Sequence, residues 1–451
     1  MSTPITIFWF RRDLRLDDNA GFYRALKNEK NVLPLFIFDR EILDKLENKK
    51  DARVEFIHHE ITRLHGELKD QGSTMLVRYG SPEKIWKTLL KEYTVEAVYT
   101  NHDYEPYAKK RDADVEALLS KKGIPFKTYK DQVIFEKDEV VKGDGTPYVV
   151  FTPYSKIWKA KLKSRLVKNT VDKATANFSY YFKPYPNKKY FKNLFQTKPE
   201  KIITLKEMGF ESTDQDIPDR AVPRKIIKTY DENRNFPAIN GTTQLGLHFR
   251  FGTISIRDKA LKASRLNETF LSELIWRDFY AMILDHFPHV ADGPFREKYA
   301  QIEWRNNEEE FNAWCEGKTG YPIVDAGMRE LNATGHMHNR VRMITASYLT
   351  KHLLINWQWG EAYFAKKLLD FDLASNNGGW QWAAGTGTDA APYFRIFNPY
   401  TQADKFDKQK LYIKKWVPEF GTDAYPEPIV DHKEARERCL RVYKEGIARA
   451  E

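Results

Sequence analysis

The feature that most constrains the fold is a regular alternation of short apolar runs and helical patterns over residues 1–130. The runs are rich in β-branched and aromatic residues: ITIFWF (5–10), VLPLFIFD (32–39), TMLVRYG (74–80), AVYTNHD (97–103) and PFKTYK (125–130). Helical patterns lie between them at 19–28, 52–71, 82–93 and 106–122. Apolar strands that alternate with helices typically form a parallel sheet covered on both faces. We therefore expect a doubly wound, Rossmann-like α/β domain over residues 1–130.

The remainder of the chain loses this rhythm. Residues 131–225 are dominated by Lys, Tyr, Pro and Asn, and they predict a long connector with short helices, including one at 154–166. From residue 226 to residue 451 the pattern is helical almost throughout, and it is clearest over 339–357. The expected organisation is an α/β domain, a connector and an all-α domain.

Composition limits the class of protein. Hydrophobic residues make up 41% and charged residues 30% of the chain, which is typical of a soluble globular protein. The two cysteines, Cys315 and Cys439, are too few for a disulfide framework, and neither a signal peptide nor a long apolar stretch is present. We expect a cytoplasmic protein with no membrane span. The formal charge of +10 fits either a polyanionic partner or a merely basic enzyme.

The stretch NNGGWQWAAGTGTDAAPYFRIFNP (376–399) combines indoles, amides and glycines without a helical or strand period. Such a composition suits the close binding of something planar and polar. The string GTGTDA within it is not a dinucleotide fingerprint, because it does not follow a strand. No histidine has a partner at metal-ligand spacing, so no metal site is expected.

Other polar groups gather upstream of this stretch. Glu273, Trp276, Arg277 and Tyr280 share one face of a predicted helix, which is either a surface face with an ion pair or a ligand wall. HNRVRM (338–343) adds further cations, and its Arg342 could pair with Asp370 or Asp372. NGTTQLG (240–246) suits either a phosphate or an ordinary capped turn.

These stretches, together with FWFRRDLRLDDN (8–19) and EGKTGYPIVDAGMRELNATG (316–335), resemble the DNA photolyase/cryptochrome family. The resemblance covers essentially the whole chain. It is closest to the class I cyclobutane pyrimidine dimer photolyases, because residues 376–399 match theirs almost letter for letter.

The resemblance implies an FAD site in the helical domain. The matching positions are Tyr230, Thr242, Thr243, Gln244, Leu245, Gly246, Asn339, Arg342, Asp370, Phe371, Asp372 and Asn376. Among them Asn376 matches the residue that faces flavin N5. The resemblance also implies that Trp380, Trp357 and Trp304 pass electrons from the surface to the flavin.

UV-damaged DNA is the implied substrate. The positions that match the lesion pocket and its phosphate contacts are Arg234, Glu273, Trp276, Arg277, Tyr280, Asn339, Arg340, Met343 and Trp382. In the implied reaction, excited and fully reduced FAD donates an electron to a flipped-out dimer, the dimer splits and the electron returns. Glu273 would hydrogen-bond a pyrimidine carbonyl and stabilise the negative charge.

The second, antenna chromophore is less defined. Members that bind folate carry a Glu in the helix after an NxxYE stretch, whereas NHDYEPYA (101–108) places Ala108 there. Folate is therefore not expected, and a deazaflavin, a second flavin or no antenna remain open.

Two other functions compete with light-driven repair. One is a cryptochrome photoreceptor that signals without repair, but signalling members usually carry a long C-terminal extension, and only a short helical pattern follows Pro399. The other, a flavoprotein active in the dark, lacks a nicotinamide site. The expected protein is a monomeric deoxyribodipyrimidine photo-lyase without an obligate protein partner.

Overall fold

The computed structural model describes residues 3–164, 166–168 and 177–450. The chain divides into two compact units. Unit 1 comprises Met1–Glu136, Ala160–Arg220 and Leu245–Lys262, and unit 2 comprises Lys137–Lys159, Ala221–Gln244 and Ala263–Glu451. Each unit is therefore assembled from separate stretches of chain.

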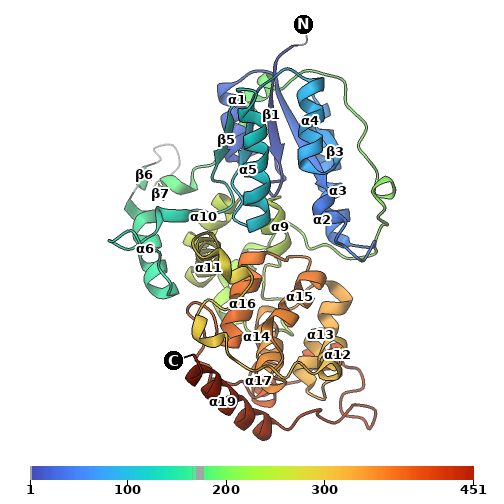
Figure 1. Cartoon of the computed structure of the whole chain (residues 1–451), viewed down its shortest axis with the longest axis vertical. Coiled ribbons are helices and arrows are strands. Elements are labelled where there is room, and N and C mark those ends of the chain that lie inside the picture. Colours follow the sequence, from blue (N-terminus) through green and yellow to red (C-terminus); the bar gives the residue numbers. More distant parts are fainter. Residues whose placement is uncertain (1–2, 165, 169–176, 451) are drawn as a thin grey trace. The chain divides into compact units, whose positions relative to one another are not determined.

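Unit 1 contains a parallel sheet in the order β3-β2-β1-β4-β5 (Figure 1). Its strands are β1 (Ile5–Phe10), β2 (Val32–Asp39), β3 (Leu76–Gly80), β4 (Val95–Asn101) and β5 (Phe126–Tyr129). The helices between them are α1 (Ala20–Asn28), α2 (Arg40–Leu43), α3 (Ala52–Lys69), α4 (Pro82–Glu92) and α5 (Pro106–Ser120). The doubly wound α/β fold predicted from the sequence is confirmed.

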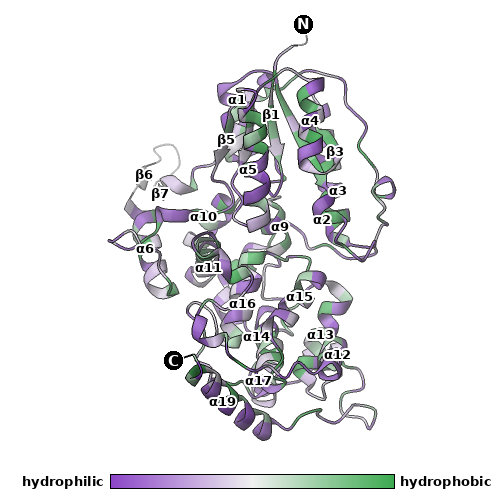
Figure 2. Cartoon of the chain, in the orientation of Figure 1, coloured by the Kyte–Doolittle hydropathy of each residue, from purple (hydrophilic) through white to green (hydrophobic). Residues whose placement is uncertain are grey.

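The central strand β1 shows how the sequence covers both faces. Ile7 and Trp9 pack with α4 and α5, whereas Phe8 and Phe10 pack with α1 and α3, because successive side chains of a strand point to opposite faces. The strands are accordingly mostly green, the hydrophobic colour, in Figure 2.

The other α-helices and two strands of three residues each follow β5 in the chain. In chain order they are α6 (Phe151–Ser164), β6 (Leu166–Lys168), β7 (Asn177–Ser179), α7 (Arg224–Lys228), α8 (Tyr230–Asn233), α9 (Gly246–Phe251), α10 (Ile256–Leu266), α11 (Glu268–His286), α12 (Glu308–Glu316), α13 (Pro322–Thr334), α14 (Asn339–Ser347), α15 (Trp357–Lys367), α16 (Leu373–Ala384), α17 (Pro399–Phe406), α18 (Leu411–Trp416) and α19 (His432–Ala448).

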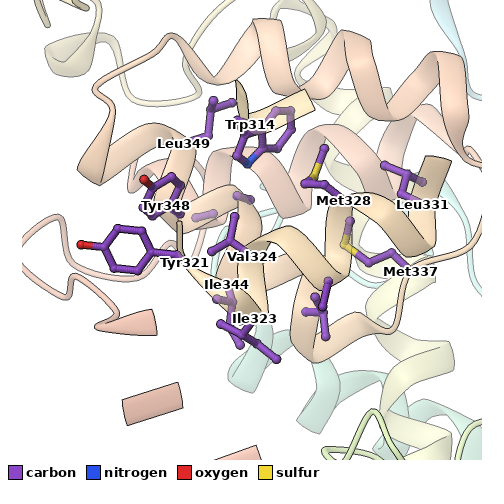
Figure 3. Packing of buried hydrophobic residues seen from close by; sticks show 14 of the residues in the cluster. Trp314, Tyr321, Ile323, Val324, Met328, Leu331, Met337, Ile344, Tyr348 and Leu349 are labelled. Atoms are coloured by element: carbon purple, nitrogen blue, oxygen red, sulfur yellow. The ribbon is translucent and has the colours of Figure 1, made fainter. Parts of the chain in front are cut away.

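The core of unit 2 forms where α12, α13 and α14 pack together (Figure 3). Trp314, Met328 and Leu331 are fully buried there. Gly327 allows the close approach of α13 and α14, since a Cβ at this position would lie 2.4 Å from Cγ1 of Val341. This packing fixes α14, which carries several of the predicted site residues.

The helical pattern over 339–357 does not form one continuous helix. Helix α14 ends at Ser347, a π-helical turn follows at Tyr348–His352, and α15 begins at Trp357. Leu354 has a φ of +50°, and the side chain of Asn356 caps α15 by accepting from the backbone N–H of Gln358. The break was hidden because its residues are as apolar as the helices on either side.

Candidate functional site

Helix α11 carries the predicted wall. The side chain of Asn267 caps its N-terminus by accepting from the backbone N–H of Phe270. The buried side of α11 includes Leu274, Ile275, Asp278 and Phe279. Glu273, Trp276, Arg277 and Tyr280 are all only half-buried, so the face that they share is not the core face of this helix.

An aromatic neighbour that the sequence did not reveal covers one face of the indole of Trp276. The ring of Phe151 stacks on it with a centroid separation of 3.7 Å and an interplanar angle of 4°. The backbone N–H of Phe151 also donates to Oδ2 of Asp389 at 3.2 Å. Phe151 begins α6, in the segment interpreted as a connector, and no local signal pointed to it. The stacked rings form a rigid apolar wall.

Glu273 has a charged partner. Its Oε1 accepts from Nη1 of Arg234 in an ion pair. The guanidinium of Arg234 lies 5.3 Å from the ring centroid of Tyr230. Burial and the Glu273 carboxylate together raise the pKa of Tyr230 to about 12. Tyr230, Arg234 and Glu273, which are far apart in the sequence, are thus neighbours in the structure.

Helix α14 begins at a second group of cations. His338 caps it, with Nδ1 accepting from the backbone N–H of Arg340 at 3.2 Å. Nη2 of Arg340 donates to Oδ1 of Asn235 at 2.7 Å, and its guanidinium lies 4.4 Å from the ring centroid of Phe406. Burial and the charges of Arg234 and Arg395 lower the pKa of Arg340. Exposed Arg395 was not among the predicted residues, although the neighbouring motif contains it.

The other α14 residues differ in exposure. Asn339 is exposed, and its Nδ2 lies 4.0 Å from Sδ of half-buried Met343. Nη2 of Arg342 pairs with both carboxylate oxygens of Asp370, at 3.0 and 3.1 Å. Of the two partners left open by the sequence, Asp370 is the one that Arg342 contacts.

Asp372 instead forms the N-cap of α16, where its Oδ1 accepts from the backbone N–H of Ser375 at 3.1 Å. The helix ends at Gly385, whose φ is +83°. Residues 376–384 therefore lie in a helix although they lack an apolar period. The N-cap and the terminal glycine define the ends of this helix. Its polar residues make contacts on several sides, so the helix has no single apolar face.

Asn376 lies next to a half-buried acid, Glu361. Its Nδ2 donates to the backbone carbonyl of Glu361 at 3.2 Å, and Nδ2 of Asn377 lies 3.5 Å from Oε1 of Glu361. Burial raises the pKa of Glu361 to about 7, despite the hydrogen bonds from the two amides. Glu361 is a second residue that sequence reasoning missed.

The predicted tryptophans belong to the helical core. Trp380 and Trp357 are each 2% exposed, whereas Trp304 is half-buried and packs against the same core. Gly360 makes room for Trp380, because a Cβ there would lie 2.1 Å from the indole. Phe371 and Trp382, both partly buried, also pack against this core.

The predicted phosphate stretch is an irregular segment. Thr242 and Thr243 are half-buried, and Gln244 is exposed with a φ of +50°. Leu245 is buried, and Gly246 begins α9.

Within the described residues, no helix is long and apolar enough to cross a membrane. No group of three His, Cys, Asp or Glu side chains among those residues could hold a metal ion.

Comparisons with known proteins match both units. Residues 6–174 match the family model described as DNA photolyase, and residues 270–423 match the one described as FAD binding domain of DNA photolyase. The deoxyribodipyrimidine photo-lyase of Synechococcus sp. is 38% identical, over 99% of this chain and 97% of the relative.

Solved structures agree with this relationship. A class III photolyase from Agrobacterium tumefaciens superimposes with a TM-score of 0.82 at 31% identity, covering 99% of this chain and 98% of the other. An archaeal photolyase from Sulfolobus tokodaii, solved with two FAD molecules, gives a TM-score of 0.80 at 33% identity, covering 98% of this chain and 100% of the other.

Proposed function

Because this chain belongs to the DNA photolyase family, we propose that it repairs cyclobutane pyrimidine dimers in DNA under blue or near-ultraviolet light. The observation that carries the proposal is the half-buried face of α11 that carries Glu273 and Trp276. There a carboxylate and a stacked indole lie in the same unit as a group of arginines, which suits a flipped-out pyrimidine dimer and its phosphates. We assign the chain to the class I subgroup because of the sequence of residues 376–399.

The residues of unit 2 fit a bound FAD. The Arg342–Asp370 pair and the amide of Asn376 offer fixed hydrogen-bonding groups, and the hydroxyls of Thr242 and Thr243 suit phosphate oxygens. In its reduced form and excited by light, FAD supplies the electron that splits the dimer. Asn376 is held by Glu361 and would present its amide toward flavin N5.

The lesion would bind against the α11 face. Trp276, fixed from behind by Phe151, offers one indole face for stacking, and Trp382 would supply the opposite wall. Paired with Arg234, the carboxylate of Glu273 would accept a hydrogen bond from a pyrimidine N–H; once protonated, it would donate to a pyrimidine carbonyl and stabilise negative charge there. A group fixed before the reaction stabilises developing charge without reorganising.

Trp380, Trp357 and Trp304 would relay electrons inward when FAD is oxidised. The first two are buried and the third is half-buried, which is the order needed for a path from solvent to the cofactor. The relay restores the active redox state of the cofactor and plays no part in splitting the dimer.

Folate is not part of the proposal. Ala108 is only 3% exposed within α5, and its methyl group offers no hydrogen bond to a pterin. A flavin or deazaflavin remains the candidate for a second chromophore. Mass spectrometry of the chromophores released from purified protein decides between them, and recovery of folate would contradict this assignment.

Lesion selectivity tests the proposed pocket. Trp276→Ala should remove mainly the preference for damaged DNA, since stacking of a base on an aromatic ring contributes about 1–3 kcal/mol. Arg340→Ala should weaken binding to damaged and undamaged DNA alike and reduce the salt dependence by roughly one phosphate contact. Binding is measured in the dark at several salt concentrations. Equal proportional losses on both DNAs in both variants would show that the pocket is misplaced.

A further inference from the structure

We propose that Asp389 is a positioning residue for the lesion pocket, because it holds Phe151 behind the indole of Trp276. The proposal rests on the function proposed above, in which Trp276 stacks on the flipped-out dimer. It also gives a role to GTGTDA (385–390), the string that is not a dinucleotide fingerprint. Asp389 acts on the lesion only through Phe151, so it is not itself a catalytic residue.

The segment that carries Asp389 is fixed to helix α16. The backbone N–H groups of Thr386 and Gly387 both donate to the carbonyl oxygen of Gln381, at 3.0 and 3.1 Å. A Cβ at Gly387 would lie 2.8 Å from that of Gln381, so the segment runs tightly against the helix. The segment therefore has a rigid origin on the same helix that carries Trp382, the proposed opposite wall.

Two neighbouring side chains of this segment hold the start of α6. Oγ1 of Thr388 donates to the carbonyl oxygen of Val149. Oδ2 of Asp389 accepts from the backbone N–H of Phe151 at 3.2 Å. The first N–H groups of a helix have no acceptor within the helix, and a carboxylate at this end is favourable. The backbone on both sides of Val150 is therefore held from a segment that is distant in the sequence.

The backbone conformation of Asp389 indicates that its surroundings impose its position. Its φ is +46°, in the left-handed region that residues with a Cβ seldom adopt. Strain of this kind persists where the surrounding contacts over-determine a residue, and it is most frequent at functional sites. Aspartate and asparagine adopt this conformation more readily than other residues with a side chain, and both offer an oxygen acceptor.

Phe151 transmits the constraint to Trp276. Besides stacking on the indole, its ring packs edge-on against Phe279, with 5.9 Å between the centroids and 79° between the planes. Trp276 is only half-buried, so this stack restricts the side of the indole that faces away from the proposed lesion. A ring that is fixed beforehand loses less conformational entropy on binding. Asp389 should therefore matter for damaged DNA and not for undamaged DNA, which binds mainly through its phosphates.

The test measures the dark affinity of FAD-loaded protein for DNA with and without a cyclobutane dimer, at several salt concentrations. Asp389→Gly removes the acceptor but tolerates the positive φ, whereas Asp389→Asn keeps an acceptor and tolerates the conformation. Asn306→Gly is the matched control. Asn306 is half-buried with a φ of +47°, and its Oδ1 accepts from the backbone N–H of Asn356, which is distant in the sequence, at 2.9 Å.

Asp389→Gly should reduce the preference for damaged DNA about two- to tenfold, the range that corresponds to immobilising one side chain. Its affinity for undamaged DNA and its salt dependence should match those of the wild type. Asp389→Asn and Asn306→Gly should both retain the full preference. Phe151→Leu should reproduce the loss, and adding Asp389→Gly to it should reduce the preference no further, because Asp389 acts through Phe151.

Three results would overturn the proposal: a full preference in Asp389→Gly, an equal loss of affinity for both DNAs, or losses that multiply in the combined variant. If Asp389→Gly does not fold, the other two variants decide, because a lost preference in Asp389→Asn or a full preference in Phe151→Leu contradicts the proposal. A wild-type protein without any preference for damaged DNA would instead contradict the proposed function.

Discussion

Carboxylates in the helical unit differ in the groups that offset their burial. Asp370 has Arg342 as a cationic partner, and Glu273 has Arg234. Among the described residues, Glu361 has the amides of Asn376 and Asn377 as partners instead of a cation, and burial raises its pKa to about 7. An acid without a cation is therefore held partly protonated next to the proposed flavin-facing Asn376.

This raised pKa predicts a pH dependence of stability. The folded pKa of Glu361 lies above the unfolded value, so its contribution is fully present below about pH 4.3 and is lost as the pH rises through about 7. Between pH 5 and 8 the wild-type unfolding free energy should fall relative to Glu361→Gln, on the order of 1–3 kcal/mol. Denaturant unfolding across this range measures the difference, and parallel curves for the two proteins would exclude the titration.

Glu273 should matter for chemistry more than for binding. The charge that it is proposed to stabilise develops only after electron transfer, so the interaction raises the yield without much ground-state affinity. Glu273→Ala should lower repair per absorbed photon and change lesion affinity by less than about tenfold, or roughly 1.4 kcal/mol. Yield at saturating DNA and affinity in the dark separate the two effects. An unchanged yield would remove Glu273 from the catalytic residues.

Local spacing predicted some of these residues but not their partners. The shared face of Glu273 and Trp276 follows from helical geometry. For Arg342 the sequence offered two possible partners, of which Asp370 is one. Phe151 and Glu361 escaped notice because the contacts that define them join distant segments, for instance Phe151 with Trp276. A spacing rule describes one element and contains no information about what packs against it.

At the scale of elements, α16 shows what periodicity misses. Its glycines and amides give no apolar stripe, yet Asp372 and Gly385 delimit a helix. By contrast, α4 and α5 were predicted correctly, since Pro82 and Pro106 begin them. The two adjacent glycines of α16 also differ in their surroundings, and this difference gives a prediction.

A Cβ at Gly378 would lie 2.2 Å from the ring of Tyr280 on α11, whereas a Cβ at Gly379 would meet nothing within 4 Å. Gly378→Ala should therefore destabilise the protein by about 1–3 kcal/mol through overpacking. The matched control Gly379→Ala should be stabilising by roughly 0.5–1 kcal/mol, since alanine is the better helix former. Unfolding free energies of the two variants provide the comparison. Equal values would mean that α16 and α11 do not pack as described.

For the whole molecule, the alternation of strands and helices predicted the α/β part of unit 1, because each strand is a short apolar run and a helical pattern separates it from the next. Which stretches of the chain belong to unit 1 and which to unit 2 could not be predicted in the same way. The stretch Leu245–Lys262 belongs to unit 1 because it contacts residues that are distant in the sequence. One such contact is the buried ion pair between Arg257 and Asp131 at 2.8 Å. Arg15 and Arg257 outweigh the burial of Asp131 and lower its pKa to about 2.

The proposed electron relay predicts that photoreduction and repair can be separated. Trp304→Phe should block the light-driven reduction of oxidised FAD by an external reductant, because phenylalanine is much harder to oxidise than tryptophan. Repair by flavin reduced beforehand should survive, since the lesion would receive its electron without passing through Trp304. Absorbance of the flavin under illumination and a repair assay measure the two activities. Loss of both would indicate a structural role for this half-buried indole.

The central claim is light-driven repair of cyclobutane dimers, and one assay tests it most directly. Purified protein containing reduced FAD is incubated with DNA that carries either a cyclobutane thymine dimer or a (6–4) photoproduct, under blue light and in the dark. We expect intact thymines from the cyclobutane dimer under light only. Repair in the dark at the same rate, repair of the (6–4) product alone, or binding without repair as in a cryptochrome would each contradict the account.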